Sequence, residues 1–197
     1  IPGQAIVHRP DSDHLATVGE FLEAQGFYTF FIYGGYGMFE NMNAYFKGND
    51  YKVIDRTDFD AKSIQAENVW GVDDESLFNN ALKAIDDNVK DAKPFFAHIM
   101  TTSNHRPFTF PEGKIDLPQG KRAGAVKYTD YAIGQLIENA KTKPWFKDTL
   151  FIIVADHCSS AAGKTKLPVD KYHIPLIFYA PDMLPAGHYP RMASQID

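Results

Sequence analysis

The sequence contains little cysteine, no long apolar run and no excess of positive charge. Cys158 is the only cysteine among 197 residues, so no internal disulfide forms and the cysteine content indicates no redox compartment. No apolar run approaches the roughly 20 residues that a membrane-spanning helix needs. The formal net charge is -5, and no basic block is available to meet a nucleic-acid backbone. These absences argue against nucleic acid as a partner and against a membrane span within these residues.

The composition is that of a chain that can bury a sizeable core. Hydrophobic residues make up 44% of the sequence, which is enough for a core at this length. No internal repeat, low-complexity tract or linker divides the chain. We therefore expect residues 1–197 to form one domain.

Candidate helices and strands alternate along the chain. Helical spacing of apolar residues predicts helices over residues 14–25, 38–46, 74–89 and 126–140, and apolar or β-branched runs predict strands over residues 27–33, 52–54, 95–100, 150–155 and 174–179. Asp73 is the expected N-cap of the helix that follows it. Residues 101–121 are rich in proline and glycine and predict a long loop, and such loops are usually functional or disordered. This alternation is typical of an α/β fold with a parallel, helix-covered sheet.

The apolar run over residues 150–155 ends abruptly at Asp156 and His157. Six apolar residues with β-branched members predict a strand that is buried on both faces. In open α/β sheets, ligands bind at the carboxyl ends of the strands. A carboxylate oxygen and an imidazole nitrogen suit zinc, manganese or iron better than calcium, which prefers oxygen alone. The pair therefore predicts a divalent-metal site.

Two further histidines flank predicted strands. His105 lies in the loop after the strand over residues 95–100, and His173 immediately precedes the strand over residues 174–179. An isolated histidine at a strand end is more often a hydrogen-bonded structural residue than a ligand. His157 differs because Asp156 stands beside it, which favours a functional interpretation.

A glycine-rich loop, Gly34-Gly35-Tyr36-Gly37, follows the strand over residues 27–33. Glycines allow backbone N–H groups to approach an anion. However, the loop matches neither the dinucleotide-binding nor the P-loop fingerprint. We expect a tight turn with functional side chains nearby rather than a nucleotide cradle.

Six segments of the chain, taken in order, resemble those of one enzyme family. They are Tyr33-Gly34-Gly35, Phe39-Glu40-Asn41-Met42-Asn43, Trp70-Gly71-Val72-Asp73-Asp74-Glu75, Thr102-Ser103-Asn104-His105-Arg106-Pro107-Phe108, Ala155-Asp156-His157 and His173-Ile174-Pro175-Leu176. Together they cover nearly the whole chain. It resembles the extracytoplasmic catalytic domain of the lipoteichoic acid synthase and phosphoglycerol transferase family, within the sulfatase and alkaline phosphatase superfamily. The resemblance implies an alkaline-phosphatase-like α/β fold, with a mostly parallel sheet and helices on both faces.

The resemblance also implies a reaction and a metal. Members transfer a phosphoglycerol group from a membrane phospholipid, through a phospho-threonine intermediate, onto a glycan or glycolipid acceptor. Asp156 and His157 resemble two of the family's metal ligands, which bind manganese, with zinc or magnesium as alternatives. His105 resembles the histidine that contacts the substrate phosphoryl group.

The remaining substrate-binding residues follow from the same resemblance. His173 resembles a histidine that precedes a Pro-Leu strand in the related phosphoethanolamine transferases. Asn41 and Asn43 fall in the family's headgroup-binding segment, where several relatives have arginine at the position of Asn43.

Part of the family's domain is expected outside this chain. The nucleophilic threonine and an acidic metal ligand lie upstream of the segment that Ile1-Pro2-Gly3 resembles, and a helix is expected after Asp197. We therefore expect the domain to be truncated at both ends, with its N-terminal part missing, and this segment alone to be inactive. The resemblance places the catalytic domain outside the cytoplasm, joined to the membrane through the missing N-terminal segment.

Two other functions compete with this interpretation. A hydrolase of the same superfamily, a sulfatase or phosphodiesterase, would carry its own nucleophile upstream, and sulfatases need a Cys or Ser within a C/S-x-P-x-R sequence. A non-catalytic periplasmic lipid-binding relative would keep the fold without the chemistry. His105, Asp156 and His157 argue against the non-catalytic alternative.

Overall fold

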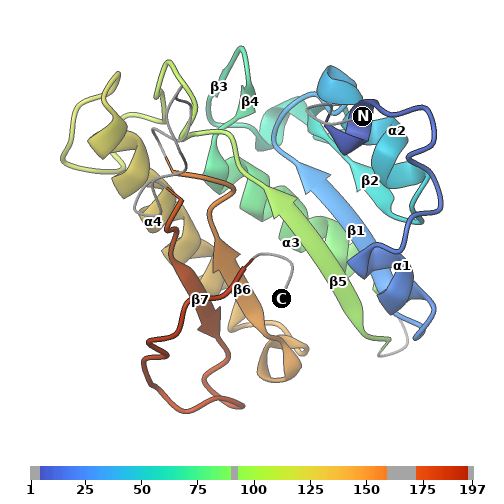
Figure 1. The fold of residues 1–197 in the computed structure, drawn as a ribbon. Coiled ribbons are helices and arrows are strands. Elements are labelled where there is room, and N and C mark those ends of the chain that lie inside the picture. Colours follow the sequence, from blue (N-terminus) through green and yellow to red (C-terminus); the bar gives the residue numbers. More distant parts are fainter. Residues whose placement is uncertain (1–4, 90–92, 159–171, 195–197) are drawn as a thin grey trace. The chain divides into compact units, whose positions relative to one another are not determined.

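A computed structural model describes residues 5–89, 93–158 and 172–194 (Figure 1). The chain divides into two compact units, residues 1–138 and residues 139–197. The larger unit contains a parallel sheet with helices, and the smaller unit contains a pair of antiparallel strands. The expectation of one domain over residues 1–197 stays a prediction.

The sheet of the larger unit has three parallel strands in the order β2-β1-β5. These are β1 (Tyr28–Tyr33), β2 (Lys52–Ile54) and β5 (Phe95–Met100). Phe30 pairs with Lys52 on one side and with Ala97 on the other. Because all three strands run in the same direction, their carboxyl ends lie at one edge of the sheet, and the loops that follow β1 and β5 emerge there.

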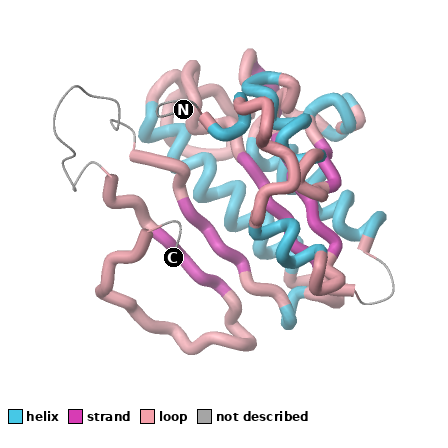
Figure 2. Tube along the Cα trace, turned by 45° about the vertical axis from the view of Figure 1, so that its right-hand side comes forward, coloured by secondary structure: helices cyan, strands magenta, loops and turns pink. Residues whose placement is uncertain are grey.

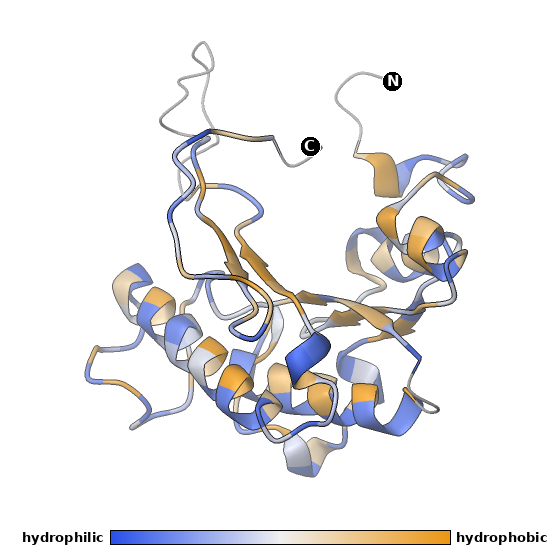
Figure 3. Cartoon of the chain, turned by 90° about the horizontal axis from the view of Figure 1, so that it is seen from below, coloured by the Kyte–Doolittle hydropathy of each residue, from blue (hydrophilic) through white to orange (hydrophobic). Residues whose placement is uncertain are grey.

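Helices cover both faces of this sheet. They are α1 (Val18–Glu23), α2 (Met42–Lys47), α3 (Asp74–Asn88) and α4 (Arg122–Ala140). Figure 3 shows α1 and α2 on one side of the sheet, and α3 and α4 on the other. This arrangement confirms the expected α/β fold with a parallel sheet.

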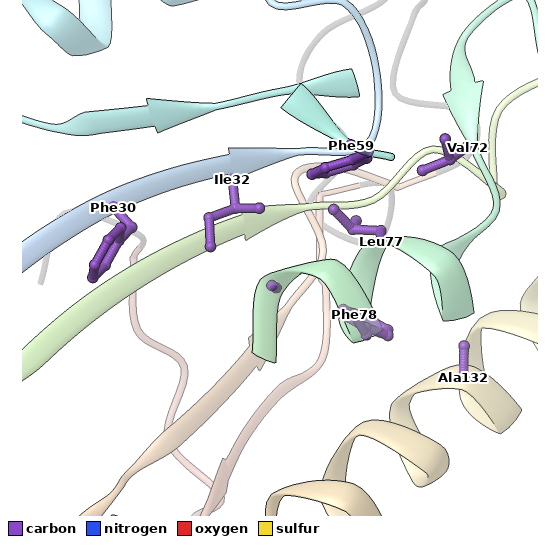
Figure 4. Packing of buried hydrophobic residues seen from close by; sticks show 8 residues of the cluster. Phe30, Ile32, Phe59, Val72, Leu77, Phe78 and Ala132 are labelled. Carbon is purple, nitrogen blue, oxygen red and sulfur yellow. The ribbon is translucent and has the colours of Figure 1, made fainter. Parts of the chain in front are cut away.

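The core follows from the alternation of side chains along β1. Phe30 and Ile32 point to one face, where they pack with Leu77 of α3 and Ala132 of α4 (Figure 4). Burying each large apolar side chain of this kind contributes about 1.5–3 kcal/mol. This face of β1 is therefore buried, as expected of a central parallel strand.

The second face of β1 carries aromatic residues. Phe31 stacks on Phe46 of α2, with ring centroids 3.6 Å apart and nearly parallel planes. Tyr33 and Tyr51 belong to the same cluster. The Tyr51 hydroxyl accepts a hydrogen bond from the Gly19 backbone N–H at 2.8 Å, which anchors α1.

Short elements complete the larger unit. The strands β3 (Glu67–Asn68) and β4 (Gly71–Val72) form a small antiparallel ribbon. Single 3-10 turns lie at η1 (Ile6–His8), η2 (Phe39–Asn41), η3 (Arg56–Asp58) and η4 (Ala61–Ser63). The predicted long loop over residues 101–121 is confirmed, since no helix or strand interrupts it.

The smaller unit consists of η5 (Phe146–Asp148), β6 (Phe151–Val154) and β7 (Leu176–Tyr179). The strands β6 and β7 lie side by side (Figure 2). They run antiparallel, with Val154 opposite Leu176. The expectation that this run is buried on both faces was wrong for the described residues, because Ile152 is 54% exposed and Val154 is 47% exposed. An apolar, β-branched run predicts a strand, but it does not say which faces other elements cover.

No helix within the described ranges combines the length and the apolar character that a bilayer crossing requires.

Candidate functional site

Close backbone contacts at the end of β1 determine where Trp70 lies. A Cβ atom on Gly71 would stand 2.1 Å from the Gly34 carbonyl oxygen, and Gly71 has a φ of 138°. The Val72 N–H donates a hydrogen bond to that oxygen at 2.9 Å. Only glycine permits this approach. It brings the β3–β4 turn, with Trp70 at its tip, against the glycine-rich loop.

Trp70 forms an aromatic row with two residues from other loops. The His105 ring lies on the indole, with centroids 3.7 Å apart at an angle of 38°. Phe39 contacts the same indole edge to face at 5.7 Å. The aromatic row, Phe39, Trp70 and His105, thus joins η2, the β3–β4 turn and the loop after β5.

His105 is exposed and presents one ring nitrogen to its surroundings. Its Nδ1 lies 3.3 Å from the Arg106 carbonyl oxygen. The Nε2 atom is therefore the ring nitrogen that can donate to, or accept from, a ligand. A histidine held in this way suits a contact with a phosphoryl oxygen.

Asn43 belongs to the predicted headgroup-binding segment, but its side chain makes a hydrogen bond within the protein. Its Nδ2 donates to Asp55 Oδ2 at 2.8 Å, and the Gly37 N–H donates to the same oxygen at 2.9 Å. Asp55 is buried, with 2% of its surface exposed. The amide of Asn43 therefore holds the glycine-rich loop to the start of η3.

Asn41 also makes a contact that orders its own segment. Its backbone is left-handed, with a φ of 59°, and its Nδ2 donates to the Val7 carbonyl oxygen at 2.7 Å. The two asparagines thus fix the path of residues 37–43. They place Phe39, which the sequence alone gave no role, against Trp70.

Asp156 and His157 follow β6 directly, as the sequence predicted, and both side chains are exposed. The His157 N–H donates to Asp156 Oδ1 at 2.8 Å, and His157 Nδ1 lies 2.8 Å from the Cys158 carbonyl oxygen. In the neutral ring, Nδ1–H donates to this carbonyl and Nε2 carries the lone pair. That Nε2 lies 3.3 Å from Asp156 Oδ2. A ring nitrogen and a carboxylate oxygen thus lie side by side, which is a donor set that zinc or manganese accepts.

His173 lies at the same end of the strand pair. The Cys158 thiol donates to the His173 carbonyl oxygen at 3.2 Å, and β7 begins at Leu176 opposite Val154. The smaller unit therefore contains Asp156, His157 and His173, three of the residues predicted to form the site, and the contact of His173 with this segment is made by its backbone carbonyl. Cys158 occupies a structural position between them.

The pair Asp156 and His157 fits two ligands of a transition-metal site. The carbonyl contact at Nδ1 is the kind of secondary hydrogen bond that metal-binding histidines usually make. Zinc and manganese take four or more ligands. Within residues 5–89, 93–158 and 172–194, no cluster of three or more His, Cys, Asp or Glu side chains is placed to hold an ion. The described residues therefore offer Asp156 and His157 as two candidate ligands and no complete metal site.

The structure brings the predicted residues together in two sets. His105, Asn41 and Asn43 lie in the larger unit, near the carboxyl ends of β1 and β5, whereas the three others lie in the smaller unit. Trp70 is the functional candidate that sequence reasoning missed. The pair Trp70-Gly71, which is typical of a turn, was the sequence feature that could have indicated its role.

Comparison with known proteins identifies relatives of the chain. It is 23% identical over 151 residues to Phosphoglycerol transferase I of Escherichia coli strain 55989, covering 71% of this chain and 20% of that protein. A solved structure of a protein in the alkaline phosphatase superfamily from Vibrio parahaemolyticus matches with a TM-score of 0.84 and 36% identity. The lipoteichoic acid synthase LtaP from Listeria monocytogenes matches with a TM-score of 0.67 and 23% identity.

The chain spans part of each relative. It covers 45% of each of the two solved chains, which in turn cover 91% and 82% of this one. The fold is therefore that of the alkaline phosphatase superfamily. The family model described as Sulfatase matches residues 3–197, and the chain belongs to the sulfatase family.

Proposed function

We propose that this chain is part of a metal-dependent transferase that moves a phosphoglycerol group from a membrane phospholipid to a glycan or glycolipid acceptor. The observation that carries the proposal is the pair Asp156 and His157 at the end of β6, with Nε2 and Oδ2 converging at 3.3 Å. The similarity to Phosphoglycerol transferase I supports the choice of the phosphoglycerol group.

Each residue has a separate role in this proposal. Asp156 and His157 hold a divalent ion, manganese in the first instance, with zinc or magnesium as alternatives. Such an ion would neutralise charge on the phosphoryl group and lower the pKa of a hydroxyl nucleophile. His105 Nε2 contacts a phosphoryl oxygen, and His173 contributes to substrate binding.

The proposed enzyme also needs a binding segment for the donor, a nucleophile and access to the membrane. Asn41 and Asn43 shape the segment that receives the headgroup, through their contacts to Val7 and Asp55. The nucleophile is a threonine outside this chain. Its oxygen takes the phosphoglycerol group as a phosphodiester, the phospho-threonine intermediate, while diacylglycerol leaves, and the acceptor hydroxyl then displaces the threonine. The domain works outside the cytoplasm, close to the membrane that supplies the donor.

The test is the removal of the Asp156 carboxylate in the full-length protein. Asp156→Ala should lower the release of diacylglycerol from phosphatidylglycerol vesicles at least about 100-fold and should reduce bound manganese. Asp182→Ala, which removes an exposed carboxylate after β7, is the matched control and should leave both unchanged. Full activity and full metal content in Asp156→Ala would refute the proposal.

A hydrolase is the second candidate, and the match to the Sulfatase model favours it. Both reactions use an activated nucleophile and a metal, so the residues above serve either. The substrate separates them. Turnover of aryl sulfates or of soluble phosphodiesters, without transfer from phosphatidylglycerol, would establish the hydrolase. Stoichiometric metal in the full-length protein would argue against a non-catalytic lipid-binding relative.

A further inference from the structure

The three residues that precede His105 are all connected to Asp74. The N–H groups of Thr102 and Ser103 donate to Asp74 Oδ1 at 3.2 and 3.0 Å. The Asp74 N–H donates to the Ser103 hydroxyl oxygen at 3.1 Å. This reciprocal set fixes the backbone where the chain leaves β5.

Asn104 is connected to the same carboxylate through α4. The Thr129 hydroxyl donates to Asp74 Oδ2 at 2.6 Å, and Asn104 Nδ2 donates to Thr129 Oγ1 at 2.6 Å. The Asp74 carboxylate thus orders residues 102–104 directly and through one hydroxyl. His105 comes next in the chain.

Burial of the Asp74 carboxylate costs folding free energy. Asp74 has no exposed surface, and burial raises its pKa because the charged form loses its water. The start of α3 does not need it, since Asp73 already caps the helix through the Ser76 N–H at 3.0 Å. A buried carboxylate that is not needed for capping calls for another role.

The loop is also restrained from the other side of His105. The His105 ring lies on the Trp70 indole. The backbone N–H of Trp70 donates to Asn68 Oδ1 at 2.8 Å. Asn68 in turn donates from Nδ2 to the Thr109 hydroxyl at 2.9 Å. The backbone connections to Asp74 and the stacking on Trp70 together determine the position of the imidazole.

We propose that Asp74 is a positioning residue for His105, acting through Thr102, Ser103 and the Thr129–Asn104 bridge to keep the imidazole on Trp70. The inference rests on the proposed function, in which His105 contacts the phosphoryl group. Asp74 itself touches no substrate.

The kinetic test uses Asp74→Asn and Thr129→Val in the full-length protein, with phosphatidylglycerol vesicles as substrate. Misplacement of a reacting group by about 1 Å costs roughly 100-fold, so we expect kcat to fall about 10- to 100-fold with little change in KM. Thr129→Val removes only the bridging hydroxyl and is an independent variant, because it leaves the Asp74 carboxylate in place. In a His105→Ala background, both substitutions should lower kcat less than about 2-fold, because they act through the missing ring.

The control is Asp73→Asn, a neighbouring buried carboxylate whose partners are Ser76, Ala66 and Tyr128. It leaves the contacts of residues 102–104 in place. We expect its effect on kcat to be the same with and without His105. Equal losses for Asp74→Asn in the two backgrounds would overturn the inference.

A spectroscopic test does not depend on activity. The Cε1–H resonance of His105 in histidine-labelled protein, assigned by its loss in His105→Ala, senses the ring current of Trp70. Asp74→Asn and Thr129→Val should shift or broaden this resonance, and Asp73→Asn should not. An unchanged resonance in both variants overturns the inference. If the protein does not act on phosphatidylglycerol, the proposed function fails and this measurement still decides the role of Asp74.

Discussion

At the scale of single residues, the glycine-rich loop is determined by a contact that leaves no room for a side chain. A Cβ atom on Gly37 would lie 1.8 Å from Asn43 Oδ1, and the Asn43 amide is held by Asp55. Gly37→Ala should therefore lower the free energy of unfolding by about 1–3 kcal/mol. Gly134→Ala is the control, since nothing lies within 4 Å of its Cβ position in α4. It should stabilise the protein by about 0.5–1 kcal/mol, and urea denaturation measures both changes.

The Asp55 carboxylate makes the free energy of unfolding depend on pH in the acid range. Burial acts to raise its pKa, but hydrogen bonds from Thr57, Asn43 and Gly37 together outweigh it and lower the pKa. A lowered pKa contributes stability above the unfolded value of about 3.9, and this stability is lost as the pH falls through the folded value. Asp55→Asn should therefore reduce the unfolding free energy at pH 7 and flatten its decline below about pH 4. A decline that stays equally steep in the variant would contradict this assignment.

Asp74 should show the opposite dependence on pH. Its pKa is raised, first of all by burial, so its contribution to stability is greatest below the unfolded pKa of about 3.9 and is lost as the pH rises through the folded value. Asp74→Asn should thus leave the unfolding free energy at pH 7 unchanged or increased while activity falls. Denaturation curves at pH 4 and pH 7 test this, and a large loss of stability at pH 7 would contradict it.

Residue identities predicted some roles and missed others. The sequence correctly placed Asp156 and His157 after a strand, because an apolar run that stops at charged residues marks such an end. It did not predict the bond between Asn43 and Asp55, because that contact depends on how α2 packs beside β2. The role of Trp70 was missed because its contacts with Phe39 and His105 join loops that are distant in the sequence.

At the scale of elements, a buried hydroxyl connects α3 and α4. The Tyr128 hydroxyl donates to Asp73 Oδ1 at 2.6 Å and accepts from the Glu75 N–H at 3.3 Å. Burial, and next the Asp73 carboxylate, raise the pKa of Tyr128, so its hydroxyl stays protonated and donates. Tyr128→Phe should lower the unfolding free energy by about 1–2 kcal/mol.

The matched control lies on the same helix. Tyr131 is half-buried, and its ring lies 5.9 Å from Lys114 Nζ, a contact that phenylalanine preserves. Tyr131→Phe should change stability by less than about 0.5 kcal/mol. Equal effects of the two substitutions in urea denaturation would show that the Tyr128 hydroxyl contributes nothing specific.

Strong sequence patterns predicted the elements well, and packing determined the rest. The strand over residues 95–100 and the helix with Asp73 as its N-cap were confirmed, since a dense apolar pattern with a cap leaves few alternatives. The first helix begins at Val18 rather than at residue 14, because Thr17 caps it and His14 has a φ of 52°. The antiparallel pairing of β6 with β7 depends on neighbours in space, which periodicity does not record.

At the scale of the whole molecule, the two units carry different parts of the proposed chemistry. The larger unit holds His105 in an aromatic row, and the smaller unit holds Asp156 and His157 after β6. The order of the six segments in the sequence predicted the family and the fold. It did not predict this division, because contacts within each unit, rather than the order of motifs, define it.

Removal of the metal from the full-length protein tests the proposed function at this scale. A chelator should abolish release of diacylglycerol from phosphatidylglycerol, and added manganese should restore it. Because the ion binds the folded state, manganese at about 100 times its dissociation constant should raise the unfolding free energy by about 2.7 kcal/mol. Asp156→Ala should lose both responses, while Asp182→Ala keeps them. Since the stability measurement needs no substrate, manganese that stabilises Asp156→Ala as much as the unaltered protein would place the ion elsewhere, whatever the enzyme transfers.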